Sequence, residues 1–234
     1  MNILAIGAHP GDVEIMCAGT LLKYREQGHS IFLALTTSGN AGSDDYSSRE
    51  ETAQVREQEQ LDAAGRYGAA VRFLRFDEGA VYDCAQLRRA MLTAIRWANP
   101  DVILTHAPWD ADADRGTTGR MVTQVLLSVG GKQHPADLPP IEKAPQVFFC
   151  DTFAGLGFLP EVYVDISAQM PEKQAVLKLF RSQQSRLKKR GVEDLGELCG
   201  DLARYRGFQA ACGCAEAFVA HKMYAFPADP RVLP

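Results

Sequence analysis

The order of apolar runs and helical segments is the feature that most constrains the fold of this chain. Residues 2–8 (NILAIGA) and 30–37 (SIFLALTT) are apolar, β-rich runs. Residues 14–27 between them have helical character and end before Gly28. A strand, a helix and a second strand in this order predict a βαβ unit with a parallel pair of strands and a right-handed crossover.

The same alternation continues along the chain. Helical segments are expected at 49–66, 85–98, 116–129 and 168–188, and strands at 70–76, 101–106, 146–152 and 161–167. This pattern predicts an α/β fold with a mostly parallel sheet and helices on both faces. The length suits one domain over residues 1–234, in which we expect residues 168–234 to form a helical and extended annex.

Composition excludes several classes of protein. The chain has 234 residues, of which 46% are hydrophobic and 23% charged, and a formal net charge of −4. These values are ordinary for a soluble globular protein and give no reason to expect a nucleic-acid partner. No apolar run reaches the roughly 18 residues of a membrane span, and no signal peptide is evident. We expect a cytoplasmic protein with its six cysteines reduced, and the sequence leaves an oligomer open.

Polar residues gather where three of the predicted strands end. They are His9 and Asp12 after the first strand, Asn40 after the second, His106 at the end of the fourth, and Asp112, Asp114 and Arg115 in the loop that follows. Because ligands bind beyond the carboxyl ends of such strands, these loops are expected to meet at one crevice. A histidine and an aspartate three residues apart can share a metal, although an aspartate in this place also caps helices.

The loop after His106 carries carboxylates at alternate positions, Asp110, Asp112 and Asp114. A solvated acidic loop is the first interpretation. The second is that Asp112 or Asp114 serves as a metal ligand or a base, because carboxylates bind zinc and harder divalent ions. His106 also has two interpretations: a hydrogen-bonded structural histidine, or a third ligand or substitute base.

Five segments carry a resemblance to a known family: GAHPGDVEIMCAGTL (7–21), SGNAGS (38–43), VREQEQLDAAGRYG (55–68), HAPWDADADRGTTGRMV (106–122) and AEAF (215–218). Together they resemble the PIG-L/LmbE family of zinc-dependent N-deacetylases. The resemblance implies a Rossmann-like sheet, a zinc cofactor and a small sugar-like substrate. In such enzymes zinc-bound water attacks an N-acetyl carbonyl, which the metal polarises.

The resemblance also implies roles for single positions. His9 and Asp12 match two of the three zinc ligands, and Arg56 matches an arginine associated with the substrate pocket. The general base of the family falls at Gly11, which has no side chain to accept a proton. The third zinc ligand, a histidine, falls at Arg115, whose guanidinium stays protonated and cannot ligate zinc. The preceding histidine of that motif falls at Asp112.

These replacements leave three hypotheses. In the first, Asp112, Asp114 or His106 replaces the missing groups, and the protein is a zinc-dependent hydrolase of N-acylated sugar-like compounds. In the second, zinc and catalysis are lost, Arg115 pairs with the Asp12 carboxylate as a built-in cation, and the protein binds a sugar-like ligand or a partner. The third is a different reaction without zinc, which no residue identifies.

Substrate-binding residues are expected at Asn40, Arg56 and Arg115 under either of the first two hypotheses. For Arg56 there is an alternative, because Arg56, Glu57 and Glu59 together are also typical of a solvated helix face. Asn40 likewise has a second interpretation, since Gly-rich turns favour asparagine for local hydrogen bonds.

Overall fold

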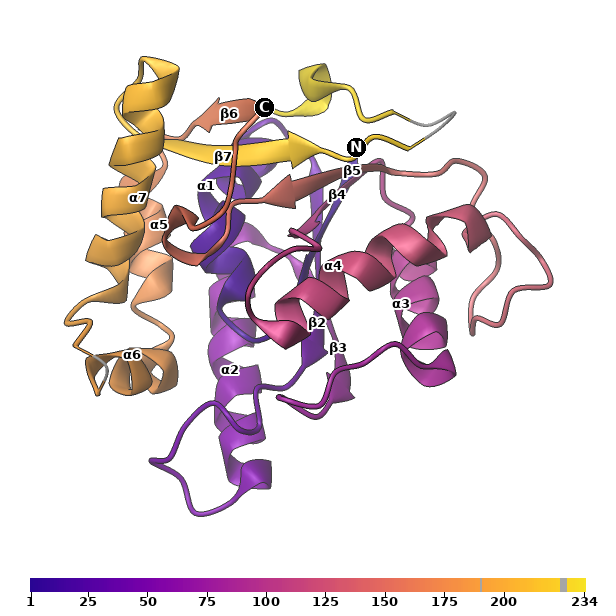
Figure 1. Ribbon diagram of the computed structural model, residues 1–234, viewed down its shortest axis with the longest axis horizontal. Coiled ribbons are helices and arrows are strands. Elements are labelled where there is room, and N and C mark those ends of the chain that lie inside the picture. The colour runs from indigo at the N-terminus through magenta and orange to yellow at the C-terminus, as the bar shows by residue number, and fades with distance from the viewer. Residues whose placement is uncertain (190, 224–226) are drawn as a thin grey trace.

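The computed structural model describes residues 1–189, 191–223 and 227–234. In this part of the chain a seven-stranded sheet has the order β3-β2-β1-β4-β5-β7-β6 (Figure 1). The strands are β1 Asn2–Gly7, β2 Ser30–Thr37, β3 Ala70–Phe76, β4 Val102–His106, β5 Gln146–Cys150, β6 Val162–Asp165 and β7 Ala215–Ala220. Neighbours from β3 to β5 pair in parallel, whereas β7 is antiparallel to β5 and β6. The predicted α/β fold with a mostly parallel sheet is confirmed.

Helices cover both faces of the sheet, as predicted. They are α1 Asp12–Glu26, α2 Arg49–Tyr67, α3 Ala85–Ala98, α4 Ala113–Val125, α5 Met170–Leu177, α6 Arg181–Lys188 and α7 Leu195–Ala210. One core packs α1, α2, α5 and α7 against the sheet, and a second packs α3 and α4 against the other face. Over the described residues, no helix is both long and apolar enough to cross a membrane.

Burial on both faces explains why residues 3–7 of β1 are apolar. Ile3 and Ala5 belong to the first core, and Leu4 and Ile6 to the second. Successive side chains of a strand point to opposite faces, so a strand covered on both faces has no position for a polar residue.

The order of the strands creates a crevice beside β1. Strand β1 pairs with β2 on one side and with β4 on the other, and the chain leaves β1 toward β2 but returns to β4 after β3. The loop after β1 therefore leads to a helix on one face of the sheet, and the loop after β4 leads to a helix on the other face. The gap between two such loops is the place where open α/β sheets bind ligands. The residues after Gly7 and those after His106 meet there.

Several helix boundaries differ from those predicted, three of them at places that matter for the fold. Helix α4 begins at Ala113 and not at residue 116, because the Asp112 carboxylate accepts a hydrogen bond from the Arg115 amide and caps the helix. The single helix expected over 168–188 is two helices, α5 and α6, separated by residues 178–180. Helix α1 begins at Asp12, two residues before the predicted start.

The C-terminal part of the chain contributes to the main sheet. Strand β7 lies between β5 and β6, and Phe218 pairs with both Cys150 and Val162. Its central position means that the last third of the chain supplies an interior strand of the sheet. The division into a domain with an annex remains a prediction.

Candidate active-site pocket

The turn after β1 is held by its own side chains and by α2. The backbone N–H of His9 donates to Oδ2 of Asp12 over 2.9 Å, and the N–H of Gly11 donates to Oε1 of Gln60 over 2.9 Å. The Gln60 amide in turn donates to Glu14, 2.8 Å away. Burial raises the pKa of Glu14 to about 7. Gly11 has φ +91°, a left-handed conformation that glycine adopts most readily.

Arg115 binds the Asp12 carboxylate. Its Nε and Nη2 lie 3.1 and 2.7 Å from Oδ1 of Asp12, and its guanidinium lies over the Phe153 ring, 5.8 Å from the centroid. The expected contact is present, but both N–H groups use one oxygen. Burial would favour a neutral Asp12, yet Arg115 and His9 outweigh it and hold the Asp12 pKa well below its usual range. Burial would lower the pKa of Arg115, but the carboxylates of Asp12, Asp112 and Asp110 outweigh this effect and raise it.

His9 lies between two carboxylates. Its Nδ1 is 3.2 Å from Oδ2 of Asp12 and its Nε2 is 3.1 Å from Oδ2 of Asp114. Burial alone would lower the His9 pKa, but Asp12 and Asp114 raise it to about 9. His9 is therefore an imidazolium at neutral pH, with both ring nitrogens donating.

Asp114 is buried, so the interpretation of all three acids as a solvated loop is wrong for this residue. Its carboxylate accepts the N–H groups of Gly79 over 2.7 Å and Val81 over 3.2 Å. The reason is the early start of α4, which turns Asp114 inward to the loop after β3. Asp112, by contrast, is exposed at the helix cap.

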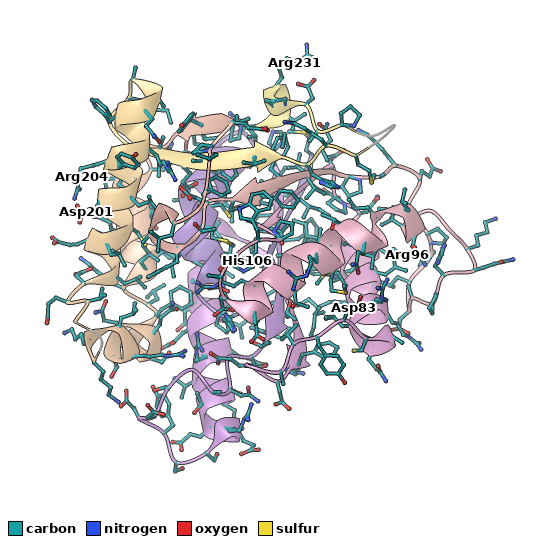
Figure 2. All side chains as sticks on the ribbon, in the orientation of Figure 1. Asp83, Arg96, His106, Asp201, Arg204 and Arg231 are labelled. Carbon is teal, nitrogen blue, oxygen red and sulfur yellow. The ribbon has the colours of Figure 1, made fainter. Side chains whose placement is uncertain are left out.

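His106 is the last residue of β4. It is buried and lies near the centre of the molecule in the view of Figure 2. The Ala8 N–H donates to its Nε2 over 3.0 Å, and the same nitrogen lies 3.2 Å from Oδ2 of Asp12. A backbone donor thus engages the lone pair of Nε2, as expected of a structural histidine. Its role as a substitute base or ligand remains a prediction.

Arg56 is buried and joins three loops, so the interpretation of the whole segment as a solvated helix face is wrong. Its guanidinium donates to the carbonyls of Gly39 and Pro10 and to the Glu78 carboxylate. Burial lowers the pKa of Arg56, although Glu78 opposes the shift. Glu59 on the same helix is also buried and accepts hydrogen bonds from the backbone N–H and hydroxyl of Ser182 on α6.

Asn40 lies away from His9. Its amide donates to Asp77 over 2.6 Å, and its oxygen accepts from Arg49 and from the Glu78 N–H. It lines a separate surface hollow together with Ser38 and Arg49. These local bonds match the turn interpretation, and the substrate role of Asn40 remains a prediction.

Most of the candidate site residues line one cavity of about 150 Å³. It is lined by His9, Asp12, Arg56, Glu78, Asp112, Arg115, Phe153, Gln183, Arg186 and Leu187. Sequence reasoning missed Glu78, Phe153 and the three residues of α6. Glu78 follows the end of a predicted strand, so the rule that placed the other candidates also identifies it. Gln183, Arg186 and Leu187 had no such signal, because α6 reaches the pocket only through the tertiary fold.

No three-ligand zinc site is evident among the described residues. The two ring nitrogens of His9 face different carboxylates, Nδ1 toward Asp12 and Nε2 toward Asp114. Asp12 is also held by Arg115, a permanent cation that would repel zinc at this distance. Across the described residues, no group of three or more His, Cys, Asp or Glu side chains is arranged to hold a metal.

Known proteins share this fold and sequence pattern. Residues 4–126 match the model of the family PIG-L, GlcNAc-PI de-N-acetylase. The uncharacterized deacetylase YaiS of Escherichia coli K12 is 40% identical over 186 residues, which cover 77% of this chain and 91% of the relative. This chain therefore belongs to the PIG-L family of de-N-acetylases.

Two solved structures extend the likeness in fold. The N,N'-diacetylchitobiose deacetylase of Pyrococcus horikoshii has a TM-score of 0.81 at 21% identity and is matched over 94% of this chain and 83% of its own. GalB, the 4-carboxy-2-hydroxymuconate hydratase of Pseudomonas putida KT2440, has a TM-score of 0.82 at 17% identity, over 96% and 98% of the two chains. The fold alone thus does not fix the reaction.

Proposed function

We propose that this protein is a member of the PIG-L family that has lost zinc-dependent deacetylation and uses the pocket at the end of β1 to bind a small sugar-like ligand. Arg115 supplies the positive charge that balances Asp12. Gly11 supplies no base. The ligand class follows from the family, whose relatives include proteins named as deacetylases of sugars.

The contact between Arg115 and Asp12 is the observation that carries the proposal. Asp12 matches a zinc ligand by resemblance, and here Arg115 donates twice to its Oδ1, while His9 and His106 lie beside Oδ2. Both carboxylate oxygens are thus engaged by protein groups. Binding zinc at Asp12 would require the Arg115 guanidinium to leave a buried carboxylate, which costs free energy before any metal is bound.

The first test is the zinc content of the purified protein after zinc loading and desalting, measured by elemental analysis. We expect far less than one zinc per chain. The matched variant carries Gly11→Asp and Arg115→His together, which restores the two groups that the resemblance implies, and we expect it to retain more zinc. One zinc per wild-type chain would contradict the proposal.

The second test is turnover and binding in the same preparation. Release of acetate from N-acetylglucosamine and from N,N'-diacetylchitobiose should be absent from the wild type with or without zinc. Calorimetric titration with sugars should still detect binding that Arg115→Gln weakens. Acetate release in proportion to bound zinc would overturn the loss of catalysis.

A hydrolase with a rebuilt metal site is the second candidate. It is favoured by Asp114, a buried carboxylate 3.1 Å from Nε2 of His9, and by the 40% identity to a protein named as a deacetylase. In this case Asp114→Asn should abolish zinc retention. Under our proposal the same change leaves the already low zinc content unaltered.

A further inference from the structure

We propose that the ligand of this pocket carries an oxyanion group, a carboxylate or a phosphate, which binds between Arg115 and Arg186. This inference rests on the proposed function in one respect, that the pocket binds a ligand. It adds the charge of that ligand and assigns a binding role to α6, which no motif of the sequence indicated.

Unused hydrogen-bond donors are the first support. Arg115 uses Nε and Nη2 on Asp12, and Arg186 uses Nη1 on Glu78, 3.2 Å away. Among the described residues, Nη1 of Arg115 and both Nε and Nη2 of Arg186 have no hydrogen-bond partner. Both side chains line the cavity and are partly accessible. Guanidinium groups with free N–H donors are well suited to bind carboxylate and phosphate oxygens.

Two of the three carboxylates that line the cavity, Asp12 and Glu78, are engaged on both oxygens, which is the second support; the third, Asp112, is exposed and uses Oδ1 to cap α4. Oδ1 of Asp12 accepts two N–H groups of Arg115, and Oδ2 accepts the backbone N–H of His9. Oε1 of Glu78 accepts from Arg186, and Oε2 accepts from Arg56 and from the Ala41 N–H. The groups left for a ligand in this part of the pocket are therefore mainly donors, and the ligand has to supply acceptors.

The wall of the cavity beside Gly11 differs from the part lined by Arg115 and Arg186. A Cβ atom on Gly11 would lie 2.4 Å from Oε1 of Gln183, so the Gln183 amide occupies the space of the side chain that the family uses as a base. This oxygen is buried and has no hydrogen-bond partner among the described residues. An amide oxygen accepts hydrogen bonds, so this wall of the cavity suits a donor such as a sugar hydroxyl, while the oxyanion group binds at Arg115 and Arg186.

The size of the cavity limits what part of the ligand enters. A volume of about 150 Å³ is small beside the roughly 300–1,000 Å³ of pockets that enclose a whole small-molecule ligand. It holds a carboxylate or phosphate group and a few further atoms. The rest of a sugar-sized ligand would extend past Phe153 and Leu187, which line the same cavity.

Calorimetric titration of the full-length protein tests the inference with matched neutral and charged probes. The probes are glucose, glucuronate, glucose 6-phosphate, N-acetylglucosamine and inorganic phosphate, each at low and high NaCl. We expect the charged probes to bind at least tenfold more tightly than the neutral sugars, since a charge-assisted hydrogen bond contributes about 1.5–3 kcal/mol. The difference should shrink as salt is raised. Glucuronate and glucose 6-phosphate decide between a carboxylate and a phosphate.

Two variants place the anion at the named residues. Arg186→Gln should weaken binding of the charged probe roughly tenfold and leave neutral sugars unchanged. Gln183→Glu, which adds a carboxylate beside Gly11, should also weaken the charged probe. Arg204→Gln is the control, because Arg204 lies on the outer side of α7, far from His106 (Figure 2), and pairs with exposed Asp201. Circular dichroism melting confirms that each variant is folded.

The outcomes separate the two proposals. Equal affinity for neutral and charged probes, with Arg186→Gln unchanged, would overturn the oxyanion inference and leave the proposed function intact. Binding of charged probes that Arg204→Gln weakens as much as Arg186→Gln would also overturn it, since the attraction would then be unspecific. No binding of any probe would contradict the proposed function itself, and the inference would fail with it.

Discussion

Helix α1 carries one buried carboxylate, Asp12, and contacts another, Glu216, and the surroundings of the two differ in a way that separates structure from function. Near the start of α1, Asp12 is paired with Arg115, which keeps free donors toward a cavity. Near its middle, Glu216 of β7 is paired with Lys173 of α5, and both side chains are only 3% exposed. The first pair faces a cavity of about 150 Å³, whereas the second borders a cavity of only about 30 Å³.

The Glu216 pair repairs a break in α1. Cys17 has non-helical angles (φ −147°, ψ 20°), which releases backbone groups on both sides. Glu216 accepts the N–H groups of Gly19 and Thr20, and Lys173 donates to the Ile15 carbonyl and to Glu216. The released groups thus find partners within the protein, as buried polar groups require.

The two buried ion pairs differ in whether a ligand can still bind to them. Both pairs join an acid and a base, and both involve groups whose pKa is shifted. They differ in their remaining hydrogen-bonding capacity: Glu216 and Lys173 bond to each other and to the backbone, whereas Nη1 of Arg115 has no partner in the described part of the chain. A satisfied network stabilises the fold, and free donors beside a cavity indicate a binding site.

The largest effect is expected for Glu216→Ala. This change leaves a buried ammonium on Lys173 without its partner and two backbone N–H groups without acceptors, and removing one partner of a buried pair costs about 3–5 kcal/mol. Urea denaturation followed by circular dichroism measures the loss. Glu197→Ala, an exposed acid in the first turn of α7, is the control. If Glu216→Ala lowers the free energy of unfolding by no more than Glu197→Ala does, the Glu216–Lys173 pair does not stabilise the fold.

A smaller loss of stability is expected for Arg115→Gln. Asp12 loses its cation, but water can enter, because 17% of the Arg115 side chain is exposed. We expect about 1–3 kcal/mol in the same urea experiment, together with weaker binding of charged sugars. If Arg115→Gln destabilises as much as Glu216→Ala and leaves ligand binding unchanged, the Asp12 pair is structural as well.

Gly11→Ala should cost less, about 1–2 kcal/mol, because an L side chain is strained at φ +91°. Gly68→Ala is the matched control, since Gly68 has φ +62° at the end of α2 and an added Cβ would meet no atom within 4 Å. A smaller loss of stability is expected for Gly68→Ala, because the added Cβ at Gly11 also lies 2.4 Å from Oε1 of Gln183. Only Gly11→Ala should alter ligand binding, because its Cβ displaces the Gln183 amide. Unchanged binding would remove Gln183 from the site.

The smallest effect is expected for Arg204→Gln. Arg204 and Asp201 are exposed neighbours on α7, and such surface pairs contribute about 0–1 kcal/mol. Thermal melting should barely change, which gives a baseline for the two buried pairs. A loss above 1 kcal/mol would mean that exposed charges matter more here than the comparison assumes.

Much of the fold could be predicted from local sequence. Apolar runs such as 30–37 and helical segments such as 85–98 have the spacing of their structures, and both appear with the predicted bounds. The spacing of apolar residues did not predict where a helix begins at a cap or is interrupted. It placed the start of α4 after the cap at Asp112, and it predicted one helix where α5 and α6 are separate. The antiparallel entry of β7 also had no local signal, because strand order depends on contacts far apart in the chain.

The candidate site divides in the same way. The sequence by itself determined the residues at the strand ends, including His9, Asp12 and His106, because parallel strands bring their carboxyl ends to one edge. It also determined that Gly11 offers no base and that Arg115 carries a permanent charge, since these are properties of the residues themselves.

Only the tertiary structure decided how these groups are used. It turned Asp114 inward, placed Asn40 at another hollow, and brought Gln183 of α6 over Gly11 and Arg186 of α6 into the cavity. The physical reason is that hydrogen bonding and burial depend on which distant segments pack together, and residues 11 and 183 have no local relation. The side-chain types were fixed by the sequence, whereas the donors left free for a ligand were fixed by the packing of α6 against the loop after β1.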